Sequence, residues 1–195
     1  MKKIAITGGI GSGKSLVRKI IMERGFPVFS CDDIYAELIN SGLYIQEICR
    51  LFPSVIVDGK IDKKRLSEIV FQNDDARKRL NGIAHPLIMA QLFKQMGACT
   101  HAYAFAEVPL LFEGGFEDLF DEVIVVMRNK QNRINAVQAR DNVSEEEALS
   151  RMDAQIDYDS ARFKSKLQKE NVHILLNDND QNQLEKSVNE LLTRI

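Results

Sequence analysis

A glycine-rich segment near the start of the chain has the residues of a loop that binds phosphate. Gly8-Gly9-Ile10-Gly11-Ser12-Gly13-Lys14-Ser15 satisfies G-x-x-x-x-G-K-[ST] and directly follows the apolar run Lys3–Thr7. Its glycines let backbone N–H groups face an anion without interference from Cβ atoms. A helix from Lys14 would add its positive end, with Lys14 reaching the β- and γ-phosphates and the Ser15 hydroxyl ligating Mg²⁺. The motif predicts a site for ATP with Mg²⁺.

Two neighbouring carboxylates, Asp32 and Asp33, follow a second apolar run, Pro27–Ser30. If that run is a strand, both lie at its carboxyl end, the edge where open α/β sheets bind ligands. A carboxylate facing the γ-phosphate can orient an acceptor hydroxyl and take its proton. Alternatively, one of the two merely caps the next helix. The residues alone leave both readings open.

The elements that must position these groups alternate along the chain. Continuous apolar runs predict strands buried on both faces of a parallel sheet, at Lys3–Thr7, Pro27–Ser30, Tyr103–Val108, Glu122–Met127 and Val172–Leu176. Helical patterns lie between them, at Lys14–Arg24, Lys63–Gln72, Ala76–Met96 and Asn129–Arg140. The apolar face made by Leu184, Val188, Leu191, Leu192 and Ile195 predicts a terminal helix that closes the sheet. The alternation predicts an α/β sandwich with a five-stranded parallel sheet.

Length and composition predict a single domain. The chain has 195 residues, 45% of them hydrophobic, which is enough for one well-buried core. Residues from about 34 to 100 are expected to form a helical substrate-binding region beside the sheet, and residues from about 129 to 169 a mobile lid. Within the lid, Ser144 and Glu147 form a capping-box pattern, which is structural and implies no chemistry.

Charge and cysteine content exclude several classes of protein. Twenty-six basic and 28 acidic residues are interspersed, so nucleic acid is not expected as a partner. Cys31, Cys49 and Cys99 form no C-x-x-C pair and suggest neither a disulfide framework nor a zinc site, which favours a reducing cytoplasm. The N-terminus leaves no room for a signal peptide, and no apolar run reaches the roughly 20 residues that span a bilayer.

Motifs outside the loop give the chain a family resemblance. The sequence resembles the dephospho-coenzyme A kinases, whose pattern runs from T-G-G-I-G-S-G-K-S through D-A-D-x-I to H-P and P-L-L-F-E. Here these segments read Thr7–Ser15, Ser30–Ile34, His85-Pro86 and Pro109–Glu113. Further matches are Asp62, Leu66, Val70-Phe71, Leu80-Asn81, Arg140-Asp141, Arg151 with Gln155, and Asn177. The resemblance covers nearly the whole chain in order, and it implies the three-layer sandwich of a P-loop kinase.

The resemblance also implies an activity and a set of site residues. The reaction would transfer the γ-phosphoryl group of ATP to the ribose 3′-hydroxyl of dephospho-coenzyme A, the last step of coenzyme A biosynthesis, with Mg²⁺. Asp32, rather than Asp33, aligns with the catalytic carboxylate and would act with Lys14 and Arg140. Nucleotide contacts would come from Gly9, Gly11, Ser12, Gly13, Lys14, Ser15, Leu16, Arg140 and Asn177. Acceptor contacts would come from Thr7, Asp32, His85, Pro109, Leu110 and Leu111. The protein would be a cytoplasmic monomer or weak homo-oligomer with no membrane partner.

The sequence departs from the family pattern at four positions. Ser30 replaces the first acid of D-A-D and Cys31 its alanine. Glu107 replaces an aspartate, and its carboxylate could hold Mg²⁺ through water. Ala136 replaces an arginine, for which Arg133, one helical turn away, is a candidate substitute.

Several of these residues also have a purely structural interpretation. Arg140 could stack on adenine or pair with phosphate, or could form a surface ion pair with Asp141 or Glu145. His85 precedes a proline, which predicts a bend there, and it could serve as a polar anchor or contact the substrate. Pro109-Leu110-Leu111 could form a wall for the acceptor nucleotide, ordinary core packing, or both.

Two other functions stay open on the residues alone. A kinase for another nucleotide or metabolite would share the loop but not P-L-L-F-E. A nucleotide-dependent switch protein of the GTPase kind needs D-x-x-G and N-K-x-D motifs, and the sequence contains neither.

Overall fold

The fold is described from a computed structural model that covers residues 1–158, 160–178 and 180–195 of the chain. The chain divides into two compact units. The first contains Met1–Phe29 and Cys99–Ile195, and the second contains Ser30–Ala98. The second unit overlaps the helical region expected at about 34–100.

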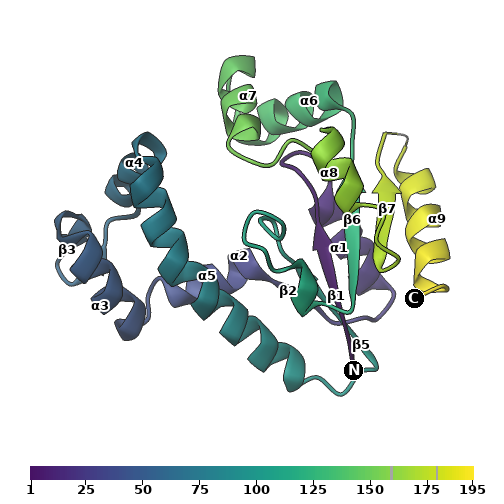
Figure 1. The fold of residues 1–195 in the computed structure, drawn as a ribbon, viewed down its shortest axis with the longest axis horizontal. Helices are drawn as coiled ribbons and strands as arrows, with labels where there is room; N and C mark the ends of the chain where they lie inside the picture. Colours follow the sequence, from purple (N-terminus) through teal and green to yellow (C-terminus); the bar gives the residue numbers. More distant parts are fainter. Residues whose placement is uncertain (159, 179) are drawn as a thin grey trace. The chain divides into compact units, whose positions relative to one another are not determined.

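A five-stranded parallel sheet forms the centre of the first unit (Figure 1). Its strands are β1 (Lys2–Thr7), β2 (Val28–Ser30), β5 (Tyr103–Glu107), β6 (Glu122–Met127) and β7 (Val172–Leu176), in the order β2-β5-β1-β6-β7. β1 lies in the middle, where Ile6 is opposite Glu107 on one side and Ile124 on the other. The predicted fold class and strands are confirmed, but the expectation that every strand is buried on both faces is wrong for β7, an edge strand whose Ile174 and Leu176 are exposed. The carboxyl end of β1 therefore opens at the centre of the sheet.

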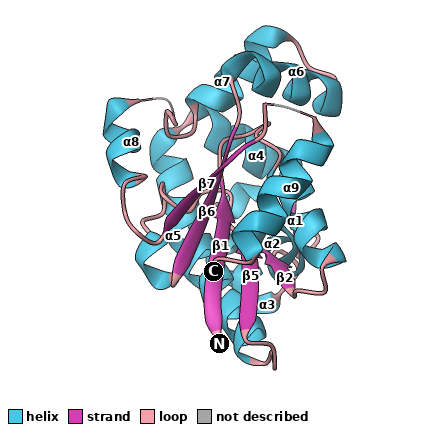
Figure 2. Ribbon diagram, turned by 90° about the vertical axis from the view of Figure 1, so that its right-hand side faces the viewer, coloured by secondary structure: helices cyan, strands magenta, loops and turns pink. Residues whose placement is uncertain are grey.

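Helices cover both faces of this sheet. Figure 2 shows α1 (Lys14–Glu23) and α9 (Gln181–Leu192) on one side and α8 (Ala161–Lys166) on the other. Val17 and Ile21 of α1 and Leu184 and Val188 of α9 are buried against the strands. Full burial of an aliphatic side chain contributes about 1.5–3 kcal/mol. The predicted terminal helix is confirmed.

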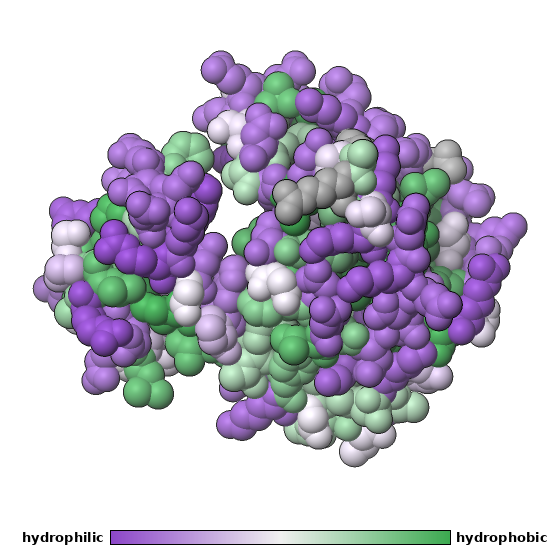
Figure 3. Space-filling view, in the orientation of Figure 1, coloured by the Kyte–Doolittle hydropathy of each residue, from purple (hydrophilic) through white to green (hydrophobic). Residues whose placement is uncertain are grey.

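Two charged helices, α6 (Lys130–Asp141) and α7 (Glu145–Asp153), fall within the predicted lid. Asn142, at φ 52°, ends α6 in the left-handed conformation, and the Ser144–Glu147 capping box starts α7 as predicted. Ile134, Val137, Ala148 and Met152 join the two helices in a small apolar cluster. Their outer surface is mostly hydrophilic (Figure 3). The pair thus buries only one narrow face.

The second unit is built from helices and one hairpin. Its elements are α2 (Cys31–Leu38), α3 (Gly42–Leu51), the 3-10 turn η1 (Pro53–Val55), β3 (Ile56–Val57), β4 (Lys60–Ile61), α4 (Lys63–Gln72) and α5 (Asp74–Gly97). The hairpin turn uses Asp58 and Gly59 at φ 49° and 74°, the positive values that Asp-Gly favours. This hairpin is not predicted from the sequence, because each strand has only two residues.

The predicted bend at His85-Pro86 is wrong, since α5 continues from Asp74 to Gly97 with Pro86 inside it. A proline within a helix costs about 3 kcal/mol. Leu80 and Ala84, on the turns before it, are buried in the core of the second unit, and this burial offsets the cost. Although α5 has 24 residues, no helix in the described part of the chain is long and apolar enough to cross a membrane.

Candidate active site

The glycine-rich loop joins β1 to α1 and folds tightly on itself. Gly13, at φ 98°, is the N-cap of α1, and Gly11 has φ 76°. The amide of Ser12 donates to the carbonyl of Gly9 at 3.1 Å. Lys14 Nζ donates to the carbonyls of Gly8 at 2.8 Å and Gly9 at 3.2 Å. The lysine ammonium is therefore held over the loop, at the positive end of a helix, as anion binding requires.

Side chains from distant segments support this loop from behind. Asn177 is buried and donates from Nδ2 to the Ser12 carbonyl at 2.8 Å. A Cβ atom on Gly13 would collide with that amide group, so only glycine fits there. Arg133 is also buried and donates from Nε to the Ile10 carbonyl at 3.0 Å. A Cβ atom on Gly11 would lie 2.5 Å from the Arg133 carbonyl oxygen. These close approaches explain two of the glycines of the motif.

A hydroxyl and a carboxylate meet at the start of α1, where a metal ion would be held. Ser15 Oγ donates to Glu107 Oε1 at 3.3 Å, and Glu107 is 7% exposed at the end of β5. Arg18 Nη1 lies 3.8 Å from the other oxygen of Glu107. Hard oxygen donors of this kind suit Mg²⁺, which usually takes one or two protein ligands plus substrate phosphates and water. No cluster of three or more His, Cys, Asp or Glu residues that could hold a metal occurs in the described part of the chain. The residues present fit Mg²⁺.

The segment after α7 is tied to the loop and to the turn after β5. Gln155 Oε1 accepts a hydrogen bond from the Ile10 amide of the loop at 2.7 Å. The next amide, that of Ile156, donates to Glu113 Oε1 at 3.0 Å. The sequence predicts no role for Gln155 beyond its match to the family pattern. The one available signal was its spacing of four residues from Arg151 in the family pattern.

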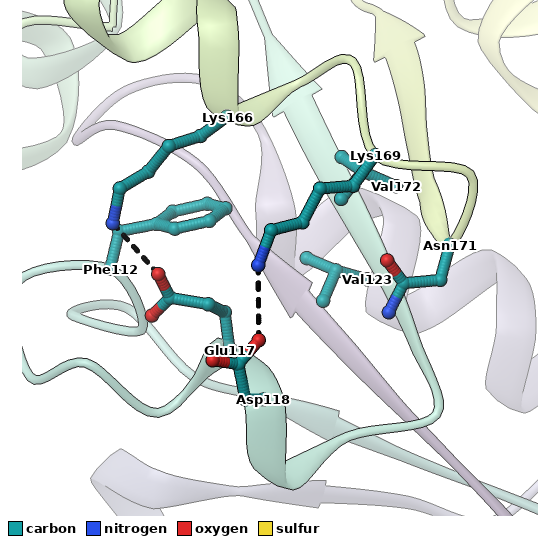
Figure 4. Close-up of a pocket in the computed structure, with 8 residues that line it drawn as sticks. All are labelled: Phe112, Glu117, Asp118, Val123, Lys166, Lys169, Asn171 and Val172. Atoms are coloured by element: carbon teal, nitrogen blue, oxygen red, sulfur yellow. Dashed lines mark hydrogen bonds and ion pairs between the residues drawn. The ribbon is translucent and has the colours of Figure 1, made fainter.

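The turn after β5 carries the Pro109–Leu111 segment and is covered by α8. Pro109 and Leu110 are half-buried and Leu111 is fully buried. Figure 4 shows Lys166 and Lys169 extending to Glu117 and Asp118 of the 3-10 turn η2 (Glu117–Leu119), at 2.7 and 3.0 Å. The Lys169–Asp118 pair is exposed and contributes about 0–1 kcal/mol, whereas the Lys166–Glu117 pair is part-buried. Phe163 of α8 also packs edge-on against Phe112 at 5.0 Å, so an aromatic contact adds to the ion pairs in this docking.

Comparison with known proteins agrees with this architecture. The sequence profile of the dephospho-CoA kinase family matches residues 2–183. The dephospho-CoA kinase of Fusobacterium nucleatum is 37% identical over 145 residues, which are 73% of this chain and 75% of that protein. The chain belongs to the dephospho-CoA kinase family. The earlier resemblance is confirmed, and the chain is an enzyme of this kinase class.

Two solved structures are similar to this chain in fold. A crystal structure from Thermus thermophilus is similar with a TM-score of 0.84 and 30% identity, covering 100% of this chain and 97% of that chain. The dephospho-CoA kinase from Campylobacter jejuni is similar with a TM-score of 0.69 and 31% identity, covering 99% and 96%. These likenesses favour neither the alternative of a different kinase nor that of a switch protein.

The segment that matches the family's D-A-D pattern contains the N-cap of α2. Ser30 is the N-cap, and its hydroxyl accepts from the Asp33 amide at 3.2 Å. The alternative that Asp32 or Asp33 caps the helix is therefore wrong. Both carboxylates lie exposed in the first turn of α2, where the helix dipole stabilises their charge. Since serine is a preferred N-cap, Ser30 in place of an acid keeps the helix start intact.

The remaining predicted residues of the dephospho-CoA kinase site have varied surroundings. Thr7 is fully buried at the end of β1. Leu16 packs its side chain against the core, and its amide donates to Gly13 O at 3.0 Å. His85 is half-buried on α5 in the second unit, and burial lowers its pKa. Their roles in substrate binding stay predictions.

Arg140, the predicted lid arginine of the family, forms the surface ion pair that was its structural alternative. Its Nε and Nη2 donate to the Asp141 carboxylate at 2.7 and 2.9 Å. Arg151 binds the same carboxylate. The hydrogen bond from Arg140 lowers the pKa of Asp141, partial burial opposes this shift, and Arg151 adds to it. The ion pair orients Arg140 at the end of α6, and a role toward nucleotide stays a prediction.

Removing the Gln155 acceptor should weaken nucleotide binding. In Gln155→Leu the KM for ATP is expected to rise about tenfold, because a part-buried amide left without its partner costs about 1–3 kcal/mol. Steady-state kinetics at saturating acceptor measure this. Gln168→Leu removes an exposed amide from the same unit and should leave the KM unchanged. An unchanged KM in Gln155→Leu would mean that the loop keeps its shape without this hydrogen bond.

Proposed function

We propose that this protein transfers the γ-phosphoryl group of ATP to the ribose 3′-hydroxyl of dephospho-coenzyme A, giving coenzyme A and ADP. The observation that carries the proposal is the phosphate loop at the end of the central strand, with Lys14, Ser15 and Glu107 around it. It occurs in a chain that belongs to the dephospho-CoA kinase family. The elements of the second unit and the lid expected at about 129–169 would bind the acceptor and cover the nucleotide.

In this proposal the loop holds the triphosphate and spreads the charge of the transition state. The amides of the loop and the Lys14 ammonium would neutralise negative charge on the β- and γ-phosphate oxygens as the bond to the leaving oxygen breaks. Ser15 and Glu107 would hold Mg²⁺, Glu107 directly or through water. When bound, Mg²⁺ would supply positive charge that offsets the negative charge of the phosphates. Asn177, Arg133 and Gln155 would keep the loop rigid, which preserves the preorganisation that this stabilisation needs.

Asp32 would act on the acceptor. Its carboxylate would accept a hydrogen bond from the 3′-hydroxyl, orient the oxygen for in-line attack, and take the proton as the new P–O bond forms. Its place in the first turn of α2, directly after β2, supports this role. His85, Thr7 and the Pro109–Leu111 segment are proposed as acceptor contacts, and Arg140 as a contact to the nucleotide. Closure of the lid would exclude water, which would otherwise hydrolyse ATP.

The cellular setting belongs to the same proposal. Cys31, Cys49 and Cys99 are free thiols, which fits a reducing cytoplasm. We expect a monomer or weak homo-oligomer that acts on a small metabolite, without nucleic acid.

The reaction is tested by measuring ADP release from ATP and Mg²⁺ with and without dephospho-coenzyme A, beside a panel of nucleosides and sugars. Turnover that depends on dephospho-coenzyme A, with coenzyme A as the product, is expected. Phosphorylation of another acceptor, with no response to dephospho-coenzyme A, would replace the proposed substrate. Omitting Mg²⁺ should abolish turnover, and turnover that persists in its absence would remove the metal from the proposal.

A further inference from the structure

A small cavity lies between the phosphate loop and the segment that follows α7. Its volume is about 10 Å³, and Ser12 of the loop, Arg128 after β6 and Tyr158 after α7 are among the residues that line it. A cavity of roughly 10–15 Å³ has room for one water molecule, provided that polar groups surround it. Ser12 and Tyr158 are 1% and 3% exposed, so their hydroxyl groups are removed from bulk solvent.

The polar atoms around this cavity are unsatisfied by protein groups. Ser12 Oγ, Tyr158 OH and Arg128 Nε are buried and have no hydrogen-bond partner among the described residues. The Thr7 hydroxyl is near enough to that of Tyr158 to influence its pKa, and it too is buried without a hydrogen-bond partner among the described residues. Burial raises the pKa of the Tyr158 phenol, the Glu113 carboxylate raises it further, and Thr7 opposes this, so the phenol stays protonated and able to donate. Buried polar atoms in folded proteins are nearly always paired with protein or with ordered water.

We propose that one buried water molecule occupies this cavity and bridges Ser12 Oγ and Tyr158 OH, which makes Tyr158 a positioning residue for the phosphate loop. A water molecule offers two donors and two acceptors. It can accept from the Tyr158 hydroxyl and the Arg128 Nε–H group and donate to Ser12 Oγ. Asn177 already binds the Ser12 carbonyl at 2.8 Å, and Arg128 Nη1 lies 3.4 Å from the Gly11 carbonyl. The water bridge would therefore hold the same stretch of loop through the side chain of Ser12.

Replacing Tyr158 by phenylalanine tests the bridge, because the direction of the change in Tm depends on whether the water is present. If the hydroxyl donates to a bound water, Tyr158→Phe removes a buried hydrogen bond and should lower the Tm by about 2–4 °C. If the hydroxyl bonds to nothing, the same change removes an unsatisfied buried group and should raise the Tm. Tyr44→Phe is the matched control, because the Tyr44 hydroxyl is also buried and has a known partner, Tyr35, at 3.5 Å. A rise in Tm for Tyr158→Phe, beside a fall for Tyr44→Phe, would overturn the proposal.

The positioning role of Tyr158 is tested by a quantity that a change in stability alone would not alter, the affinity for ATP. Under the proposed function, Tyr158→Phe should raise the Kd for ATP about three- to fivefold at a temperature where both proteins are folded, because the loop loses one support. Ser12→Ala should raise it similarly, and the double variant should be no weaker than either single variant, because both hydroxyls bind one water. Additive losses would overturn the shared bridge. If the unmodified protein binds ATP but shows no turnover with dephospho-coenzyme A, that result counts against the proposed substrate and leaves the bridge standing.

A crystal structure at a resolution of about 1.5 Å provides the direct test. A water peak within about 2.6–3.2 Å of both Ser12 Oγ and Tyr158 OH is expected, and it should be missing or displaced in Tyr158→Phe. A cavity without density in an otherwise well-ordered map, or a water in contact with only one of the two oxygens, would overturn the bridge.

Discussion

Replacing Lys14 by methionine is expected to lower kcat by about 10³-fold while the protein stays folded. The methionine keeps the aliphatic stem of the side chain and removes the ammonium that would face the β- and γ-phosphates. Removal of one preorganised charge or donor aimed at the transition state costs about 10²–10⁵ in rate in comparable sites. Coupled measurement of ADP formation at saturating dephospho-coenzyme A and ATP gives kcat directly.

The control for Lys14→Met lies on the same helix. Lys19 is also on α1, but its side chain is 67% exposed and pairs only loosely with Glu23, at 3.7 Å. Lys19→Met should leave kcat and KM within a factor of two, as expected for an exposed pair worth about 0.5 kcal/mol. Because Lys14 donates to two carbonyls of the loop, its loss should also lower the Tm slightly. Retention of kcat within tenfold in Lys14→Met would show that the ammonium does not stabilise the transition state.

Replacing Asp32 by asparagine is expected to lower kcat by about 10²–10⁴-fold, with little change in the KM for ATP. Asparagine keeps the size of the side chain and its hydrogen-bonding oxygen, but it cannot take the proton of the acceptor hydroxyl. The loss should therefore fall on the chemical step rather than on nucleotide binding. Single-turnover measurement of coenzyme A formation separates this step from product release.

Asp33→Asn is a closely matched control for Asp32→Asn. Asp32 and Asp33 lie in the first turn of α2, are both exposed, and interact with the same helix dipole. Loss of either charge removes an interaction with the helix dipole worth about 0.3–1 kcal/mol. Activity should separate them, with Asp33→Asn close to the unmodified protein. If Asp33→Asn loses activity while Asp32→Asn keeps it, the catalytic assignment moves by one residue.

The predictability of the elements followed the length of the apolar signal in each one. The strands Glu122–Met127 and Val172–Leu176 were predicted with their observed ends, since continuous apolar runs in a parallel sheet leave little choice of boundary. The hairpin at Asp58-Gly59 was missed because its strands are too short for a periodic signal. The bend at His85-Pro86 was predicted from local sterics alone, and packing of the same helix at Leu80 and Ala84 overrides that preference.

By itself the sequence determined the phosphate loop, the sheet and the family, because those features depend on contiguous residues whose types and order carry the signal. Only the tertiary structure decided what supports the loop. Asn177, Arg133 and Gln155 bind loop atoms from 165, 123 and 145 residues away along the chain. The structure likewise decided that Tyr158 and Ser12 line one cavity. No local pattern encodes such contacts, since they exist only where folding brings distant polar atoms within hydrogen-bond distance and removes water from around them.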